Sequence, residues 1–172
     1  MESLFYVPLL GSIRLFVSAP TPAFLVLAVF FDGRFFHSSY PSFIDTAFLS
    51  IASLEILAVV VSLKLWSEEL RGQRILVRTN NQNTELAINT GRSRVPFVQS
   101  CLRELLFYAS SFDFEMRALY IPGHQNTIAD SLSRWATDPQ FEHTFYEAAH
   151  LHYSTLTEYI CTFDLFRFDC QW

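Results

Sequence analysis

The clearest pattern of apolar positions is helical and lies in residues 51–70. Apolar residues recur there at helical spacing, at Ile51, Leu54, Ala58, Val61 and Leu65. Charged residues gather toward the end of this stretch, and a glycine at position 72 follows it. We therefore predict a helix over residues 51–70 that Gly72 terminates.

A second pattern, in residues 23–40, predicts a β-hairpin. An apolar run is followed by Asp32-Gly33 and then by the sequence RFFHSSY. Asp-Gly between two apolar strands is a favoured two-residue hairpin turn. Asp32 is accordingly interpreted as a turn residue and not as a metal ligand.

Shorter strands and helices are expected to alternate up to residue 135. The predicted elements are a strand over residues 74–79, a helix over 83–90, a helix over 96–110, a strand over 114–121 and a short helix ending near Trp135. Asparagines precede two of these helices as candidate caps, at Asn80, Asn81 and Asn126. Residues 1–20 show no clear pattern. The alternation of strands and helices predicts an α/β domain built around a mixed sheet.

The composition supports a folded domain with an uneven distribution of charge. Hydrophobic residues make up 51% of the chain, 18 residues are phenylalanine, and the net charge is −5. Residues 136–172 hold six acidic residues and one arginine, which accounts for the whole net charge and leaves residues 1–135 neutral. Residues 64–103 are locally basic, with seven basic and three acidic residues. Such a stretch can contact phosphates, although an ordinary solvated surface explains it equally well.

Cysteine usage and hydropathy favour an intracellular protein, either cytoplasmic or nuclear. Three cysteines do not form an even set of disulfides. Residues 24–31 form an apolar run of eight, whereas a membrane span needs about 20 residues. Glu2 and Arg14 argue against a signal peptide. In the tail, His143, His150, His152 and Cys161 match no zinc-binding spacing.

Three places in the sequence, which together hold five residues, stand out as candidates for chemistry. Glu55 is the one charged residue between Ile51 and Val61, and it either has a role in the interior or faces water at the edge of its helix. Asn80 and Asn81 end an apolar strand, where ligand sites gather in α/β sheets, but they could equally be plain caps. His124 precedes a helix that carries Asp130, which suits proton transfer. The alternative is that Asp130 only pairs with Arg134.

Three segments of the chain, taken together and in their order along the sequence, resemble the ribonuclease H domain of retrotransposon polyproteins. The segments are SLEILAVVVSLKLW, RILVRTNNQNTELAINTGRSR and YIPGHQNTIADSLSRW. The ending GHQNTIADSLSRW is similar to the N-x-x-A-D-A-L-S-R close of that domain in tyrosine-recombinase elements of the DIRS type. The resemblance covers residues 17–135. It leaves residues 1–16 as an unassigned N-terminal segment and residues 136–172 as an acidic, aromatic tail.

The resemblance implies a ribonuclease H-like fold, with a mixed five-stranded sheet flanked by helices. Members of this family cleave the RNA strand of an RNA–DNA hybrid, and four acidic residues hold two Mg²⁺ or Mn²⁺ ions. Glu55 and Asp130 match two of these acidic residues. Asn80 and Ser18 stand where the family has aspartates, Ser18 by aligning VSAPTPA with V-D-A-S/T-P-T-G. His124 falls near a histidine that helps product release in some members.

Loss of two carboxylates leads us to expect weak metal binding, by Glu55 and Asp130 alone. Two unit charges about 4 Å apart are worth roughly 4 kcal/mol at an effective dielectric near 20, and a divalent ion doubles this. We expect Glu55, Asn80 and Asp130 to converge within about 10 Å, the span of a two-metal site. The candidate nucleic-acid contacts are Arg78, Asn81, Gln82, Arg92 and Arg94.

Three functions remain open at this point. The chain is an inactive relic that still binds nucleic acid such as an RNA–DNA hybrid, a nuclease that works with a reduced ligand set, or a non-catalytic protein-interaction module on the same fold. The resemblance implies an origin in a reverse transcriptase polyprotein, and no membrane partner is expected.

Overall fold

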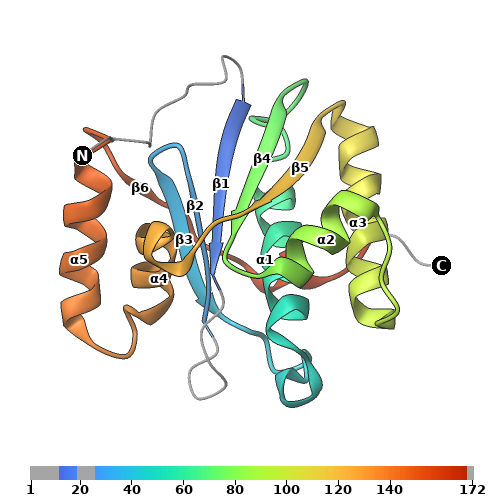
Figure 1. Cartoon of the computed structure of the whole chain (residues 1–172), viewed down its shortest axis with the longest axis horizontal. Helices are drawn as coiled ribbons and strands as arrows, with labels where there is room; N and C mark the ends of the chain where they lie inside the picture. Colours follow the sequence, from blue (N-terminus) through green and yellow to red (C-terminus); the bar gives the residue numbers. More distant parts are fainter. Residues whose placement is uncertain (1–11, 19–25, 170–172) are drawn as a thin grey trace.

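The computed structural model of the chain describes residues 12–18 and 26–169, with side chains described from residue 26 onward. Its helices lie on both faces of one sheet (Figure 1). The strands are β1 (Ser12–Ser18), β2 (Val26–Phe31), β3 (Arg34–Ser39), β4 (Arg74–Thr79), β5 (Glu115–Tyr120) and β6 (Thr157–Glu158). The helices are α1 (Ile51–Leu65), α2 (Gln82–Thr90), α3 (Pro96–Phe112), α4 (Thr127–Arg134) and α5 (Pro139–His150). Three short 3-10 helices are η1 (Thr46–Phe48), η2 (Gly123–Gln125) and η3 (Phe163–Phe166).

The described strands form one mixed sheet in the order β5-β4-β1-β2-β3-β6. β1 is antiparallel to β2 and parallel to β4, and β4 is parallel to β5. The expectation of five strands was wrong, because the sheet has a sixth. The tail supplies this strand, β6, whose Thr157 N–H donates to the Gly33 carbonyl at 2.8 Å and extends the β3 edge.

The sheet separates two apolar cores. Leu27, Val29 and Phe31 of β2 belong to the core under α1 and α3, whereas Ala28 and Phe30 belong to the core under α4 and α5. This alternation follows from the two-residue period of a strand. Because both faces are covered, β2 is buried along its whole length, and its sequence shows no polar alternation.

Helix α1 is the central helix and is buried from Ser53 to Leu63. The predicted helix is confirmed, and its burial extends beyond the recurring positions Leu54, Ala58 and Val61, since a helix enclosed on all sides is apolar all round. The predicted end at residue 70 was wrong, because the helix stops at Leu65. The side chain of the C-cap residue Trp66 is fully buried, with its ring 5.2 Å from that of Phe31. From Trp66 to Gly72 the chain continues as turns, in which the Leu70 N–H donates to the Trp66 carbonyl at 3.0 Å.

Most other predicted elements are confirmed with small shifts. Asp32 and Gly33 both have positive φ, 46° and 76°, as a type I′ hairpin turn requires. Gly91 ends α2 in the left-handed region, and Pro96 begins α3, which continues to Phe112 instead of stopping at residue 110. Asn126 precedes α4 but makes no side-chain cap hydrogen bond. Within the described ranges, no helix has the length and apolar character needed to cross a membrane.

Candidate functional site

Three parallel strands end at the same edge of the sheet, and the candidate residues follow these ends. Phe16 of β1 pairs with Arg78 of β4 near this edge, where Ser18 is the last residue of β1 and Asn80 directly follows β4. Thr79 of β4 pairs with Tyr120 of β5, and η2 and α4 follow β5. Ligand sites of α/β sheets form at such carboxyl edges.

Glu55 reaches this edge from α1 and is buried, with 1% of its surface exposed. The alternative that it faces water was wrong. Its Oε2 atom accepts hydrogen bonds from the hydroxyls of Thr79 and Thr84, both at 2.8 Å. Burial raises the pKa of Glu55 to about 7, and the two threonine hydrogen bonds oppose this rise. The carboxyl group therefore changes its charge near neutral pH.

Thr79 and Thr84 are site residues that the sequence analysis missed. Thr79 ends β4 on the side that faces α1, and it is fully buried like Thr84. The Thr79 hydroxyl also accepts the Asn81 N–H at 3.1 Å, which ties the turn after β4 to Glu55. A signal was present in the sequence: Thr79 continues the buried alternation of Ile75 and Val77 as a polar residue, so its hydroxyl needed an internal partner.

The asparagines after β4 have two different roles. The Asn81 side chain accepts from the Asn83 N–H at 3.0 Å and the Thr84 N–H at 3.4 Å, so it caps α2 as expected. Asn80 is exposed at the edge itself. A Cβ atom added to Gly123 would lie 3.8 Å from Asn80 Nδ2, so the start of η2 is close to Asn80. The turn that carries His124 therefore approaches the end of β4.

His124 and Asp130 lie beyond β5. His124 is exposed in η2, and its carbonyl accepts from the Thr127 hydroxyl at 3.1 Å. Asp130 lies in the first turn of α4, and its carboxylate is 3.2 Å from Arg134 Nε. The i,i+4 ion pair between Asp130 and Arg134, which the sequence analysis gave as the alternative to proton transfer, is therefore present. Both side chains of this pair are partly exposed, at 32% and 49%.

The basic candidates lie beside the same edge. Arg92 and Arg94 are exposed in the connection between α2 and α3. They line a hollow of about 300 Å³ together with Ser50 at the start of α1 and Asn83 at the start of α2. Arg78 is half-buried in β4, and Gln82 is exposed. The positive charge therefore flanks the first turns of two helices.

These side chains do not fit a pair of divalent cations. The part of the chain with described side chains holds no cluster of three or more histidine, cysteine, aspartate or glutamate residues. Asn80 is neutral, Asp130 is paired with an arginine, and one oxygen of Glu55 is engaged by two hydroxyls. Two magnesium ions need several charged oxygen ligands.

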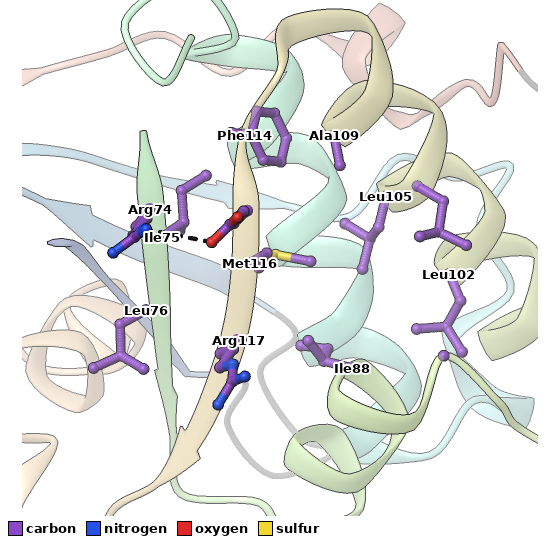
Figure 2. A pocket seen from close by; sticks show the side chains of 13 residues that line it. Arg74, Ile75, Leu76, Ile88, Leu102, Leu105, Ala109, Phe114, Met116 and Arg117 are labelled. Atoms are coloured by element: carbon purple, nitrogen blue, oxygen red, sulfur yellow. Dashed lines mark ion pairs between the residues drawn. The ribbon is translucent and has the colours of Figure 1, made fainter. Parts of the chain in front are cut away.

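A cavity of about 760 Å³ lies at the other end of the strands. Figure 2 shows its apolar lining, with Leu102, Leu105 and Ala109 of α3 facing Phe114 and Met116 near the start of β5. An ion pair between Arg74 and Glu115 at 3.4 Å lies at its rim. None of the candidate residues described above lines this cavity.

Comparisons with known proteins agree on the architecture. No protein-family model matches the sequence, and no curated protein matches it. The crystal structure of RNase H1 from the halophilic archaeon Halobacterium salinarum is similar, with a TM-score of 0.56 and 16% identity over 75% of this chain and 99% of that chain. An RNase H1 isolated from compost by a metagenomic approach gives a TM-score of 0.48 and 10% identity over 72% of this chain and 93% of that chain. The likeness to the Halobacterium salinarum structure shows a mixed α/β fold of the ribonuclease H type.

Proposed function

We propose that this chain is a nucleic-acid-binding ribonuclease H-like domain that binds RNA–DNA hybrid and cleaves it weakly or not at all. The observation that carries the proposal is the carboxyl edge of β1, β4 and β5. Glu55 is held there by two threonine hydroxyls, and neutral Asn80 directly follows β4.

The chemistry of this edge supports binding more than hydrolysis. Metal-activated hydrolysis of a phosphodiester needs carboxylates that neutralise the cations and orient the water. The described side chains offer Glu55, whose pKa is raised to about 7 by burial, and Asp130, which already has a cationic partner. We infer that Mg²⁺ or Mn²⁺ binds weakly, and we derive no catalytic step through either ion.

The basic side chains beside the edge support binding of a polyanion. Arg92 and Arg94 are exposed at the same hollow, and each arginine that contacts a phosphate contributes salt-sensitive affinity. Arg78, Asn81 and Gln82 complete the set of proposed contacts. His124, on the turn near Asn80, is proposed to lie beside the bound backbone.

We further propose that the domain derives from a reverse transcriptase polyprotein of a tyrosine-recombinase retrotransposon. The support is the sequence resemblance that ends in GHQNTIADSLSRW. Reverse-transcriptase and recombinase segments in the neighbouring genomic sequence are the expected finding, and unrelated neighbours would contradict this origin.

The test of function compares binding with cleavage. Fluorescence anisotropy with a labelled RNA–DNA hybrid at low and moderate salt should show salt-sensitive binding. The same hybrid should remain largely uncut with Mg²⁺, and manganese should support more residual cleavage because it tolerates less ideal ligation. Asn80→Asp should raise Mg²⁺ affinity, and Ser18→Asp with Asn80→Asp should give the largest gain in cleavage, which Glu55→Gln should abolish.

Two outcomes would overturn the proposal. Robust Mg²⁺-dependent cleavage by the unmodified chain would show a working nuclease with a reduced ligand set. Equal binding of the hybrid at both salt concentrations, or no binding at either, would show that nucleic acid is not the ligand. That result would favour a non-catalytic protein-interaction module.

A further inference from the structure

The last described segment of the chain, residues 162–169, lies across α1 and α3. We term this segment the strap. Figure 1 shows the red C-terminal segment leaving β6 at one edge of the sheet and ending beside α3. Phe166 of the strap is 2% exposed, and its ring lies 6.3 Å from the ring of Tyr40. Phe168 lies 6.2 Å from Phe97 of α3. Two alternate phenylalanines of the strap are thus inserted against the core of the domain.

A buried ion pair lies under the strap. Lys64 of α1 and Glu104 of α3 are 2.7 Å apart, and their side chains are 4% and 0% exposed. Glu104 Oε1 accepts the backbone N–H of Asp169 at 2.8 Å, and Lys64 Nζ donates to the carbonyl of Arg167. The pair therefore binds the main chain of the strap through one acceptor and one donor.

The Asp169 side chain adds a third polar contact. Its Oδ2 atom accepts from the Tyr108 hydroxyl at 2.6 Å and lies 3.4 Å from Lys64 Nζ. The hydrogen bond from Tyr108 and the charge of Lys64 hold the pKa of Asp169 below its ordinary value. A carboxylate at this position is recognised by a hydroxyl and by a cation that is itself shielded from water.

The contacts between the strap and the domain are specific because Lys64 and Glu104 are buried charges. Charges taken out of water are costly unless every remaining donor and acceptor finds a partner. The strap provides such partners to Lys64 and Glu104 through its backbone, while the two phenylalanines remove apolar surface from water. The recognised pattern is directional: an aromatic residue, any residue bound by its carbonyl, a second aromatic residue and an acidic residue.

We propose that the surface of α1 and α3 beneath the strap is a peptide-binding site for segments of the pattern aromatic-any-aromatic-acidic, occupied by the chain's own Phe166, Arg167, Phe168 and Asp169 as a releasable strap. The proposal does not rest on nucleic-acid binding, because its polar contacts come from Lys64, Glu104 and Tyr108, none of which is a proposed nucleic-acid contact. It gives the acidic, aromatic tail a ligand role within its own domain.

The strap also reaches the surroundings of Glu55. Phe166 packs on Tyr40, whose hydroxyl donates to the Leu54 carbonyl at 3.3 Å, one residue before Glu55. Release of the strap therefore uncovers the ring that borders the buried carboxyl group. A partner that carries the same peptide pattern would compete with the strap for binding to α1 and α3.

The test uses the full chain with a strap variant, Phe166→Ala with Asp169→Ala. The matched control is Phe163→Ala with Asp164→Ala, which changes the same residue types at exposed positions of the strap. The probe is a fluorescein-labelled peptide of residues 162–169, TFDLFRFD. A tethered segment has an effective concentration on the order of millimolar, so wild type and control should bind the probe at least about tenfold more weakly than the strap variant. Wild-type-like binding by a folded strap variant would overturn the proposal.

Hydrogen exchange provides a second test that does not depend on folding of the double variant. In the wild-type chain, amides of the strap should exchange faster than those of α1, because the strap opens locally. Asp169→Ala should raise exchange in the strap by about tenfold or more, the effect expected for losing hydrogen bonds to a charged group, whereas Asp164→Ala should not. Exchange of the strap only together with α1 would show that it is not releasable and would overturn the proposal.

Discussion

The buried carboxyl group of Glu55 allows a quantitative prediction for the substitution Glu55→Gln. Burial raises its pKa from 4.5 to about 7, so the folded protein binds this proton more tightly than the unfolded chain does. The stability that this group contributes is fully present below pH 4.5 and is lost as the pH rises through about 7. Each pKa unit corresponds to about 1.4 kcal/mol, so the charged carboxylate costs the folded state about 3 kcal/mol at pH 8.

Glutamine keeps an oxygen that accepts from Thr79 and Thr84 but carries no charge. We expect Glu55→Gln to raise the free energy of unfolding at pH 8 by about 1 to 3 kcal/mol, the upper value being reduced by a buried amide N–H that lacks a partner. At pH 5 the same substitution should be neutral or slightly destabilising, because the glutamate is then already protonated.

The assay is urea unfolding followed by tryptophan fluorescence at pH 5 and pH 8. The difference between variant and wild type at each pH cancels the other titrating groups. Glu69→Gln at an exposed position is the control and should give the same difference at both pH values. An equal effect of Glu55→Gln at pH 5 and pH 8 would refute the reasoning, because the carboxyl group would then have an ordinary pKa.

Three further predictions follow from particular contacts. Thr79→Val should destabilise the fold by about 1 to 3 kcal/mol, measured by urea unfolding, because Glu55 loses a hydroxyl donor; an unchanged midpoint would show that this hydrogen bond contributes nothing. Gly33→Ala should lower the melting temperature, because φ is +76° and the added Cβ would lie 2.8 Å from the Thr155 carbonyl oxygen, whereas Gly72→Ala keeps a similar strain with no close atom and should cost less. Arg92→Gln with Arg94→Gln should weaken hybrid binding and reduce the slope of log affinity against log salt by about 2, and an unchanged slope would place the nucleic acid elsewhere.

The sequence alone determined the elements whose signals are local. The Asp32-Gly33 turn, the Asn81 cap and the Gly91 terminus depend on backbone geometry and nearby hydrogen bonds, so residue type was sufficient to predict them. The strand over Arg74–Thr79 was also predicted with its observed bounds, because its apolar positions alternate.

The tertiary structure decided features that depend on distant partners. The apolar and polar pattern of residues 12–18 did not predict a strand, because β1 is defined by pairing with β2 and β4, which follow it in the chain. The burial of Trp66 just after α1 depends on its contact with Phe31 of β2, and the sixth strand depends on a tail that returns to β3. Local propensity carries no information about either.

The candidate site likewise has one part that the sequence predicted and one part that only the tertiary structure decided. The position of Glu55 in an apolar run predicted a carboxylate with unusual surroundings, because a lone charge among apolar residues is costly to bury. Its partners Thr79 and Thr84 lie 24 and 29 residues away in the chain. Only the packing of α1 against β4 and α2 brings them together, and this contact decides both the pKa of Glu55 and how little charge the site offers to a metal ion.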